Sequence, residues 1–123
     1  MDDSFQTLLQ KVWHCTLMCE KCANESILRP DHGHLSECIR LSQDCAEICV
    51  LLAKSIKRQS ILLPALLDLC EWICNQCARE CNKHPADHCQ QCAAACLLCS
   101  EACYLLKERL QTRGDNGFDQ SAS

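Results

Sequence analysis

The hydrophobic positions of this chain recur every three or four residues, which is the period of an amphipathic helix. Residues 70–81, "CEWICNQCAREC", keep that spacing with cysteine and contain no Pro, no Gly and no run of β-branched residues. The period is interrupted where Pro, Gly and polar residues gather, at 28–34, 57–64 and 82–87. Because such residues end helices, the pattern predicts four of them. Their expected ranges are about 3–27, 34–57, 61–83 and 86–113.

Helices of similar length joined by short connections are typical of a bundle. The predicted fold is therefore all-α, an antiparallel up-down four-helix bundle with a cysteine-lined core. A chain of 123 residues fits one domain. We expect the bundle to span 1–113 and the polar residues 114–123 to form a frayed tail.

One stripe on each predicted helix faces inward, and every cysteine of the chain falls on such a stripe. The 15 cysteines are Cys15, Cys19, Cys22, Cys38, Cys45, Cys49, Cys70, Cys74, Cys77, Cys81, Cys89, Cys92, Cys96, Cys99 and Cys103. The remaining stripe positions at one end are aliphatic: Leu8, Val12, Leu52, Ile56, Leu63, Leu67, Leu106 and Leu110. We expect these aliphatic residues to form a plug and the thiols to form a column about 20 Å tall beside it.

Histidines gather at the end opposite the plug. His32 and His34 lie in or beside the first connection, and His84 and His88 flank the third. In an up-down bundle these two connections share one end, so four of the five histidines are expected at one mouth. His14 lies off the inward stripe and is expected at the surface.

Composition excludes several classes of protein. The N-terminus has two acids and no long apolar run, unlike a secretory signal, so a reducing cytosol and free thiols are expected rather than a disulfide framework. A net charge of -4 with few aromatic residues does not suit nucleic-acid binding. We also expect no membrane span, because the longest apolar stretches are interrupted by polar residues.

Buried cysteine commonly serves as a small hydrophobe, but aliphatic residues would pack a core without risk of oxidation. Thiolate catalysis needs one activated cysteine in an accessible cleft, so no enzyme is expected. An iron-sulfur cluster would leave most thiols unexplained. Cu(I) and Zn(II) remain, and copper is favoured on charge: stacked four-thiolate zinc sites carry two negative charges each, whereas one Cu(I) per thiolate is nearly neutral.

Six pairs of cysteines at i,i+4 spacing place two sulfurs one turn apart, suited to holding one ion each. These pairs are 15/19, 45/49, 70/74, 77/81, 92/96 and 99/103. With the histidine-bearing mouth, they resemble the four-helix-bundle copper storage proteins over about 15–110. The resemblance implies a preformed cytosolic bundle that fills with many Cu(I) ions through one open end and assembles as a homotetramer.

Two stripe positions depart from the expected cysteine, Ser26 and Ser42, so the capacity should lie near the cysteine count. His84 and His88 are the better candidates for further ligands, and His32, His34 and Met18 stay open. Two alternatives also stay open: a zinc-dependent structural or interaction bundle, and a thiol redox buffer. Apolar residues off the thiol stripe, among them Ile39, Ile48, Trp72, Ile73, Leu97, Leu98 and Tyr104, suggest an oligomer interface.

Overall fold

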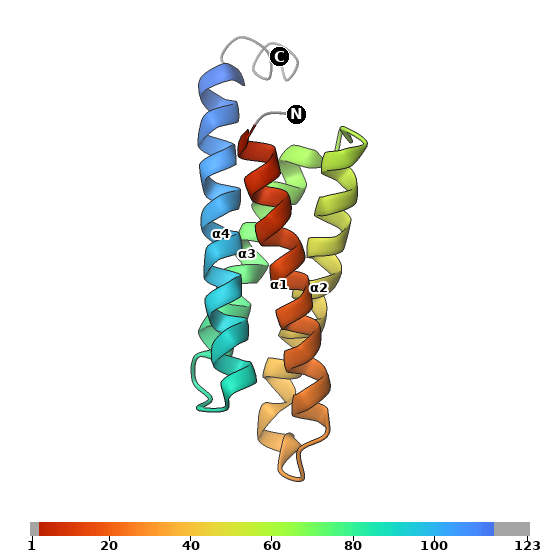
Figure 1. Ribbon diagram of the computed structural model, residues 1–123, viewed down its shortest axis with the longest axis vertical. Coiled ribbons are helices and arrows are strands. Elements are labelled where there is room, and N and C mark those ends of the chain that lie inside the picture. Colours follow the sequence, from red (N-terminus) through yellow and green to blue (C-terminus); the bar gives the residue numbers. More distant parts are fainter. Residues whose placement is uncertain (1–2, 115–123) are drawn as a thin grey trace.

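The computed structural model is a four-helix bundle whose helices run alternately up and down (Figure 1). It describes residues 3–114. The helices are α1 (Asp3–Ile27), α2 (Ser36–Lys57), α3 (Leu63–Cys81) and α4 (Asp87–Gly114), and the short 3-10 helix η1 (His32–Leu35) precedes α2. The predicted all-α bundle is confirmed, and the described part of the chain contains no strand.

Each helix packs mainly against two neighbours, in the order α1, α2, α3, α4 and back to α1. The helices therefore form a square that encloses one core, to which each contributes one stripe. The connection between α2 and α3 lies at the same end as the start of α1 and the end of α4 (Figure 1). The α1–α2 and α3–α4 connections lie together at the opposite end, which we call the mouth.

Helix α3 is shorter than the prediction of 61–83. It begins at Leu63 with Pro64 in its first turn, where the missing N–H of proline leaves no hydrogen bond unmade. It ends at Cys81, so His84 lies in the α3–α4 connection and not on the α3 stripe. The physical reason is Pro85, because the residue before a proline is disfavoured in helical conformation.

The end of α2 is a Schellman motif without glycine. Gln59 has a φ of 53°, the left-handed conformation that glycine usually supplies. The Ser60 N–H donates to the Ser55 carbonyl at 2.9 Å, and the Gln59 N–H donates to the Ile56 carbonyl at 3.2 Å. These bonds satisfy carbonyls at the end of α2 and reverse the chain toward α3.

The predicted aliphatic plug is present at the end opposite the mouth. Leu8, Val12 and Leu52 are fully buried, and Ile56, Leu67 and Leu106 are nearly so. Leu63 and Leu110 are half-buried against this core. The plug closes one end of the bundle with residues that bind no metal.

Helix α4 is more apolar than was expected from the polar residues that interrupt it. Within Asp87–Thr112 it is long and apolar enough to cross a membrane, judged by length and composition alone. Half of its most apolar window is buried inside the bundle, as in the core helix of a soluble protein. The expectation that no segment approaches a membrane span was therefore too strict.

The structure describes the bundle side of the expected boundary between the bundle and its tail, but not the tail. Gly114 is the last residue of α4. Residues 115–123 lie outside the described part of the chain, so the polar tail stays a prediction.

Candidate metal centre

All 15 cysteines are free, and each is fully buried. They line the axis of the bundle between the plug and the mouth, as the spacing predicted. Burial of this many thiols without disulfides gives a core that is apolar when protonated and strongly metal-binding when deprotonated.

The sulfur atoms converge in five groups in which every pair of ligand atoms lies within 4.8 Å. Three groups contain four thiols: Cys15, Cys49, Cys74 and Cys99; Cys15, Cys19, Cys45 and Cys96; and Cys19, Cys77, Cys92 and Cys96. Two groups contain three thiols: Cys70, Cys99 and Cys103; and Cys22, Cys38 and Cys81. Each group is of the size needed for one thiolate-bound metal ion.

Four of these groups are linked, because neighbouring groups share thiols. Cys99 and Cys15 each belong to two groups, and Cys19 and Cys96 connect the next pair of groups. A thiolate that belongs to two groups can bridge two metal ions. The arrangement is therefore a continuous array rather than a set of isolated sites.

The closest thiol contacts run between helices. Cys38 and Cys81 are 3.1 Å apart and Cys45 and Cys74 are 3.6 Å apart, both across α2 and α3. Within one helix, the i,i+4 pair Cys15 and Cys19 is 3.9 Å apart. The i,i+4 pairs found from the sequence thus supply ligands, but each group draws its thiols from two or more helices.

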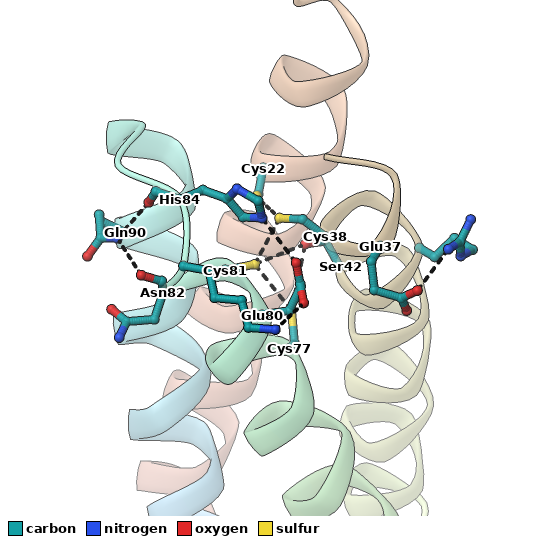
Figure 2. Close-up of polar contacts among 12 residues, drawn as sticks. Cys22, Glu37, Cys38, Ser42, Cys77, Glu80, Cys81, Asn82, His84 and Gln90 are labelled. Carbon is teal, nitrogen blue, oxygen red and sulfur yellow. Dashed lines mark hydrogen bonds and ion pairs between the residues drawn. The ribbon is translucent and has the colours of Figure 1, made fainter. Parts of the chain in front are cut away.

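The three-thiol group Cys22, Cys38 and Cys81 lies nearest the mouth (Figure 2). The buried Ser42 is close by, with its Oγ 3.7 Å from Cys81 and 3.6 Å from Cys77. Cys89 joins none of the five groups. Every other cysteine of the described chain belongs to at least one group.

Neighbouring thiols alter one another's acidity, because a thiolate accepts hydrogen bonds from the thiols around it. Hydrogen bonds from Cys15 and Cys19 lower the pKa of Cys45 to about 7. Hydrogen bonds from Cys70 and Cys99 lower the pKa of Cys103 to about 5. Burial raises the pKa of Cys89 to about 11. Neighbouring thiols therefore favour the thiolate at Cys45 and Cys103, whereas burial favours the protonated thiol at Cys89.

At the mouth, His84 is held between a carboxylate and a second histidine. Its Nε2 lies 3.1 Å from Glu80 Oε2, and its ring centroid lies 5.8 Å from that of His34. Burial alone would raise the pKa of the Glu80 carboxyl. The hydrogen bonds from His84 and Lys83 outweigh burial and lower this pKa below its usual value. Gln90 donates a hydrogen bond of 2.7 Å to the His84 carbonyl and fixes the connection (Figure 2).

His88 is the more buried mouth histidine, and both its ring nitrogens have partners. Its Nδ1 lies 3.2 Å from Glu25 Oε2, and its Nε2 lies 3.1 Å from the Oγ of the fully buried Ser26. His88 thus links a solvent-exposed carboxylate to the end of the thiol column. The sequence placed His88 beside Cys89 but gave no sign of Glu25 as its partner.

The other three histidines are exposed to solvent. His32 is exposed, and its Nδ1 lies 3.0 Å from the Arg29 carbonyl oxygen. His34 is exposed and contacts His84. His14 is exposed on α1, as expected, and Met18 is half-buried. The four histidines expected at the mouth end therefore lie there, and two of them, His34 and His84, are in ring contact.

This geometry suits a soft monovalent cation. A closed structural zinc site needs four ligands, but two of the five groups offer only three thiols. Cu(I) accepts two or three thiolates, so it can occupy linked groups through bridging sulfurs. The donor set therefore favours several copper ions in a row.

The chain matches a known family along most of its length. The family model for Csp, copper storage protein, matches residues 1–108. Among curated proteins, the cysteine-rich protein YhjQ of Bacillus subtilis (strain 168) is 37% identical over 93 residues. The match covers 76% of this chain and 86% of YhjQ, whose function is uncharacterized.

Solved structures of the same shape hold copper. The Cu(I)-bound copper storage protein BsCsp3 is 36% identical with a TM-score of 0.80, covering 83% of this chain and 96% of its own. A cytosolic copper storage protein from Streptomyces lividans, loaded with five coppers, is 29% identical with a TM-score of 0.83. That match covers 86% of this chain and 93% of the relative. The Streptomyces protein has also been solved with 10 copper equivalents.

Proposed function

The chain belongs to the copper storage protein family, and from this we propose that it stores about one Cu(I) ion per cysteine on the thiolates of its core. The observation that carries the proposal is the linked array of thiol groups. Four groups that share Cys15, Cys19, Cys96 and Cys99 let each thiolate serve two ions. Sharing raises the number of ions that a fixed number of thiols can hold.

The relatives support copper as the stored metal. BsCsp3 is Cu(I)-bound, and the Streptomyces lividans protein has been solved with five coppers and with 10 copper equivalents. Loading of the Streptomyces lividans protein with several coppers is the behaviour that the linked groups of this chain favour. The zinc-dependent bundle and the thiol redox buffer gain no comparable support.

We assign metal binding to all 15 cysteines, with His84 and His88 as additional ligands where copper passes through the mouth. Support for the two histidines is their position, since His88 is buried beside Ser26 and His84 lies three residues after the end of α3. Both rings are oriented by carboxylates, Glu25 and Glu80. A carboxylate partner of this kind fixes the ring of a histidine ligand and raises its basicity.

The plug supports storage in a cage that exists before metal arrives. Because the aliphatic end and the protonated thiols are both apolar, the bundle has a core without copper. Uptake then needs loss of thiol protons but no folding. A storage role with no catalytic step follows, and a cytosolic location agrees with the Streptomyces relative, which is a cytosolic copper storage protein.

We further propose that the chain assembles as a homotetramer through exposed apolar residues. Leu97, Leu98, Tyr104 and Leu105 on the outer side of α4 are about half exposed, and Trp72 on α3 is also exposed. Ile73 is buried and belongs to the core instead. Large exposed side chains gathered on one helix are more typical of an interface than of a free surface.

The test is an anaerobic titration of fully reduced protein with Cu(I), with a chromophoric chelator as competitor. We expect uptake to continue to about one ion per cysteine while the helical circular dichroism signal stays unchanged. A parallel titration with Zn(II) is the control. Uptake that stops at two or three ions, or a stronger response to zinc, would contradict copper storage. Little helix in the metal-free protein would contradict the preformed cage.

A further inference from the structure

The thiol group nearest the mouth is separate from the other four. Cys22, Cys38 and Cys81 share no member with any other group, whereas the other four groups are linked by common thiols. The linked groups contain eleven cysteines: Cys15, Cys19, Cys45, Cys49, Cys70, Cys74, Cys77, Cys92, Cys96, Cys99 and Cys103. We call these eleven the inner array and the separate three the outer site.

Ser42 lies at the boundary between the two. Its side chain is fully buried, and it occupies the α2 stripe between Cys38 and Cys45. Its Oγ lies 3.6 Å from Cys77 and 3.7 Å from Cys92, both of the inner array. The same atom lies 3.7 Å from Cys81 of the outer site. Ser42 therefore stands where a thiol would join the two sets (Figure 2).

A hydroxyl does not replace a thiolate at this position. Cu(I) prefers soft sulfur ligands, and a serine hydroxyl remains protonated and hard. Cys77 and Cys81 touch at 3.8 Å along α3, yet no converging group among residues 3–114 contains both. The contacts inside the outer site are closer, at 3.1 Å and 3.6 Å.

We infer, on the basis of the proposed storage function, that Ser42 divides the copper store into an inner array and an outer exchange site. Thiolates of the inner array can each bridge two ions, so an ion there is held by sulfurs that are themselves fixed by further ions. Thiolates of the outer site belong to one group only, and their sulfur contact with the inner array is that of Cys81 with Cys77. At equilibrium the outer site fills last, and it empties first.

The outer site is also the one next to the mouth. His84 follows Cys81 by three residues, and its N–H donates to the Cys81 carbonyl at 3.1 Å. Cys89, which joins no group, lies in the first turn of α4, at the mouth end of that helix. A copper acceptor that reaches the mouth therefore meets ions of the outer site before those of the inner array.

The experiment measures copper release from fully loaded, reduced protein after mixing with excess chromophoric Cu(I) chelator under anaerobic conditions. Wild-type protein should release copper in two phases, with a fast amplitude of roughly a fifth, since the outer site holds three of 15 thiols. Cys38→Ser should remove most of the fast phase and leave the slow phase unchanged. Cys74→Ser, a change within the inner array, should reduce the slow phase instead.

Ser42 itself is tested by a matched pair of variants. Ser42→Cys supplies the missing thiol, so the fast phase should merge into the slow one and capacity should rise by about one ion. Ser42→Ala supplies no ligand and should keep two phases. Circular dichroism checks that each variant remains helical.

The outcomes separate this inference from the storage function. A single release phase in the wild-type protein, or two unchanged phases in Ser42→Cys, would overturn the division while leaving storage intact. If the two release phases also merged in Ser42→Ala protein, the absence of a thiol at position 42 could not be the cause of the division. Failure of the wild-type protein to load many copper ions would instead overturn the proposed function.

Discussion

The sulfur atoms of Cys38 on α2 and Cys81 on α3 lie 3.1 Å apart, although 43 residues separate them in sequence. Both side chains are fully buried, and Cys22 on α1 completes their group. Three helices therefore meet at one point near the mouth. The short distance between the two sulfurs favours this pair for disulfide formation in the metal-free protein.

We expect Cys38 and Cys81 to form the first disulfide when metal-free protein is oxidised, because their sulfurs need to move only about 1 Å to bond. Peptide mapping by mass spectrometry without reduction would identify the pair. Cys45 and Cys74 provide the control, since they join the same two helices at 3.6 Å but lie deeper. Earlier crosslinking of Cys45 and Cys74 would contradict the prediction, and copper loading should suppress both.

Replacing Gln59 with glycine should stabilise the metal-free bundle by about 1 kcal/mol, because glycine adopts the left-handed conformation without the steric cost of a side chain. Urea unfolding followed by circular dichroism would measure the gain. Lys57→Gly, inside the last turn of α2, should instead destabilise the protein by a similar amount. Equal effects of the two changes would argue against the Schellman motif.

Truncation in the plug should cost stability without reducing copper capacity. Leu52 is fully buried, so Leu52→Ala should lower the free energy of unfolding by about 2–5 kcal/mol. The control is Ile61→Ala, because the Ile61 side chain is 95% exposed. This change should alter the free energy of unfolding by less than about 0.5 kcal/mol. A loss of bound copper in Leu52→Ala protein that still folds would show that the plug also shapes the metal array.

Alkaline pH should remove the stabilising contribution of Cys89. The pKa of this thiol is raised by burial from 9.0 to about 11, so the folded state retains a proton that the unfolded state loses. The contribution is complete below pH 9 and is lost as pH rises toward 11. The stability difference between wild-type and Cys89→Ser metal-free protein should therefore shrink over this window. A difference that stays constant would contradict the raised pKa.

A negative charge on the outer side of α4 should disrupt self-assembly. Leu97 is 56% exposed, so Leu97→Asp should place its charge in the proposed interface without entering the core. Light scattering after size-exclusion chromatography would report the mass of the assembly. Gln43→Asp on the polar outer side of α2 is the matched control and should leave the mass unchanged. An unchanged mass for Leu97→Asp protein would contradict an interface on the outer side of α4.

Periodicity was enough to predict the bundle and the burial of every thiol. Cys70, Cys74, Cys77 and Cys81 follow the helical period, and all four are fully buried on α3. Only one face of a helix can be buried in a four-helix bundle, so a stripe of cysteines defines that face. Local sequence therefore contains the information that decides which residues reach the core.

The grouping of the thiols could not be predicted in the same way. Which cysteine of α2 meets which cysteine of α3 depends on how far the helices are shifted along and rotated about their axes. The contact between Cys38 and Cys81 is a product of that packing. The end of α3 was misjudged for a local reason, because the period continues to His84 while Pro85 disfavours helix there.

Serine at two inward positions shows how the capacity of such a bundle can change over generations. Ser26 and Ser42 are both fully buried, on the inward stripes of α1 and α2. Cysteine and serine differ by one atom, and the aliphatic plug contains neither residue. A single codon change can therefore add or remove a ligand while the architecture stays the same. The quantity of metal that the protein holds is thus an evolvable trait that natural selection can adjust in small steps.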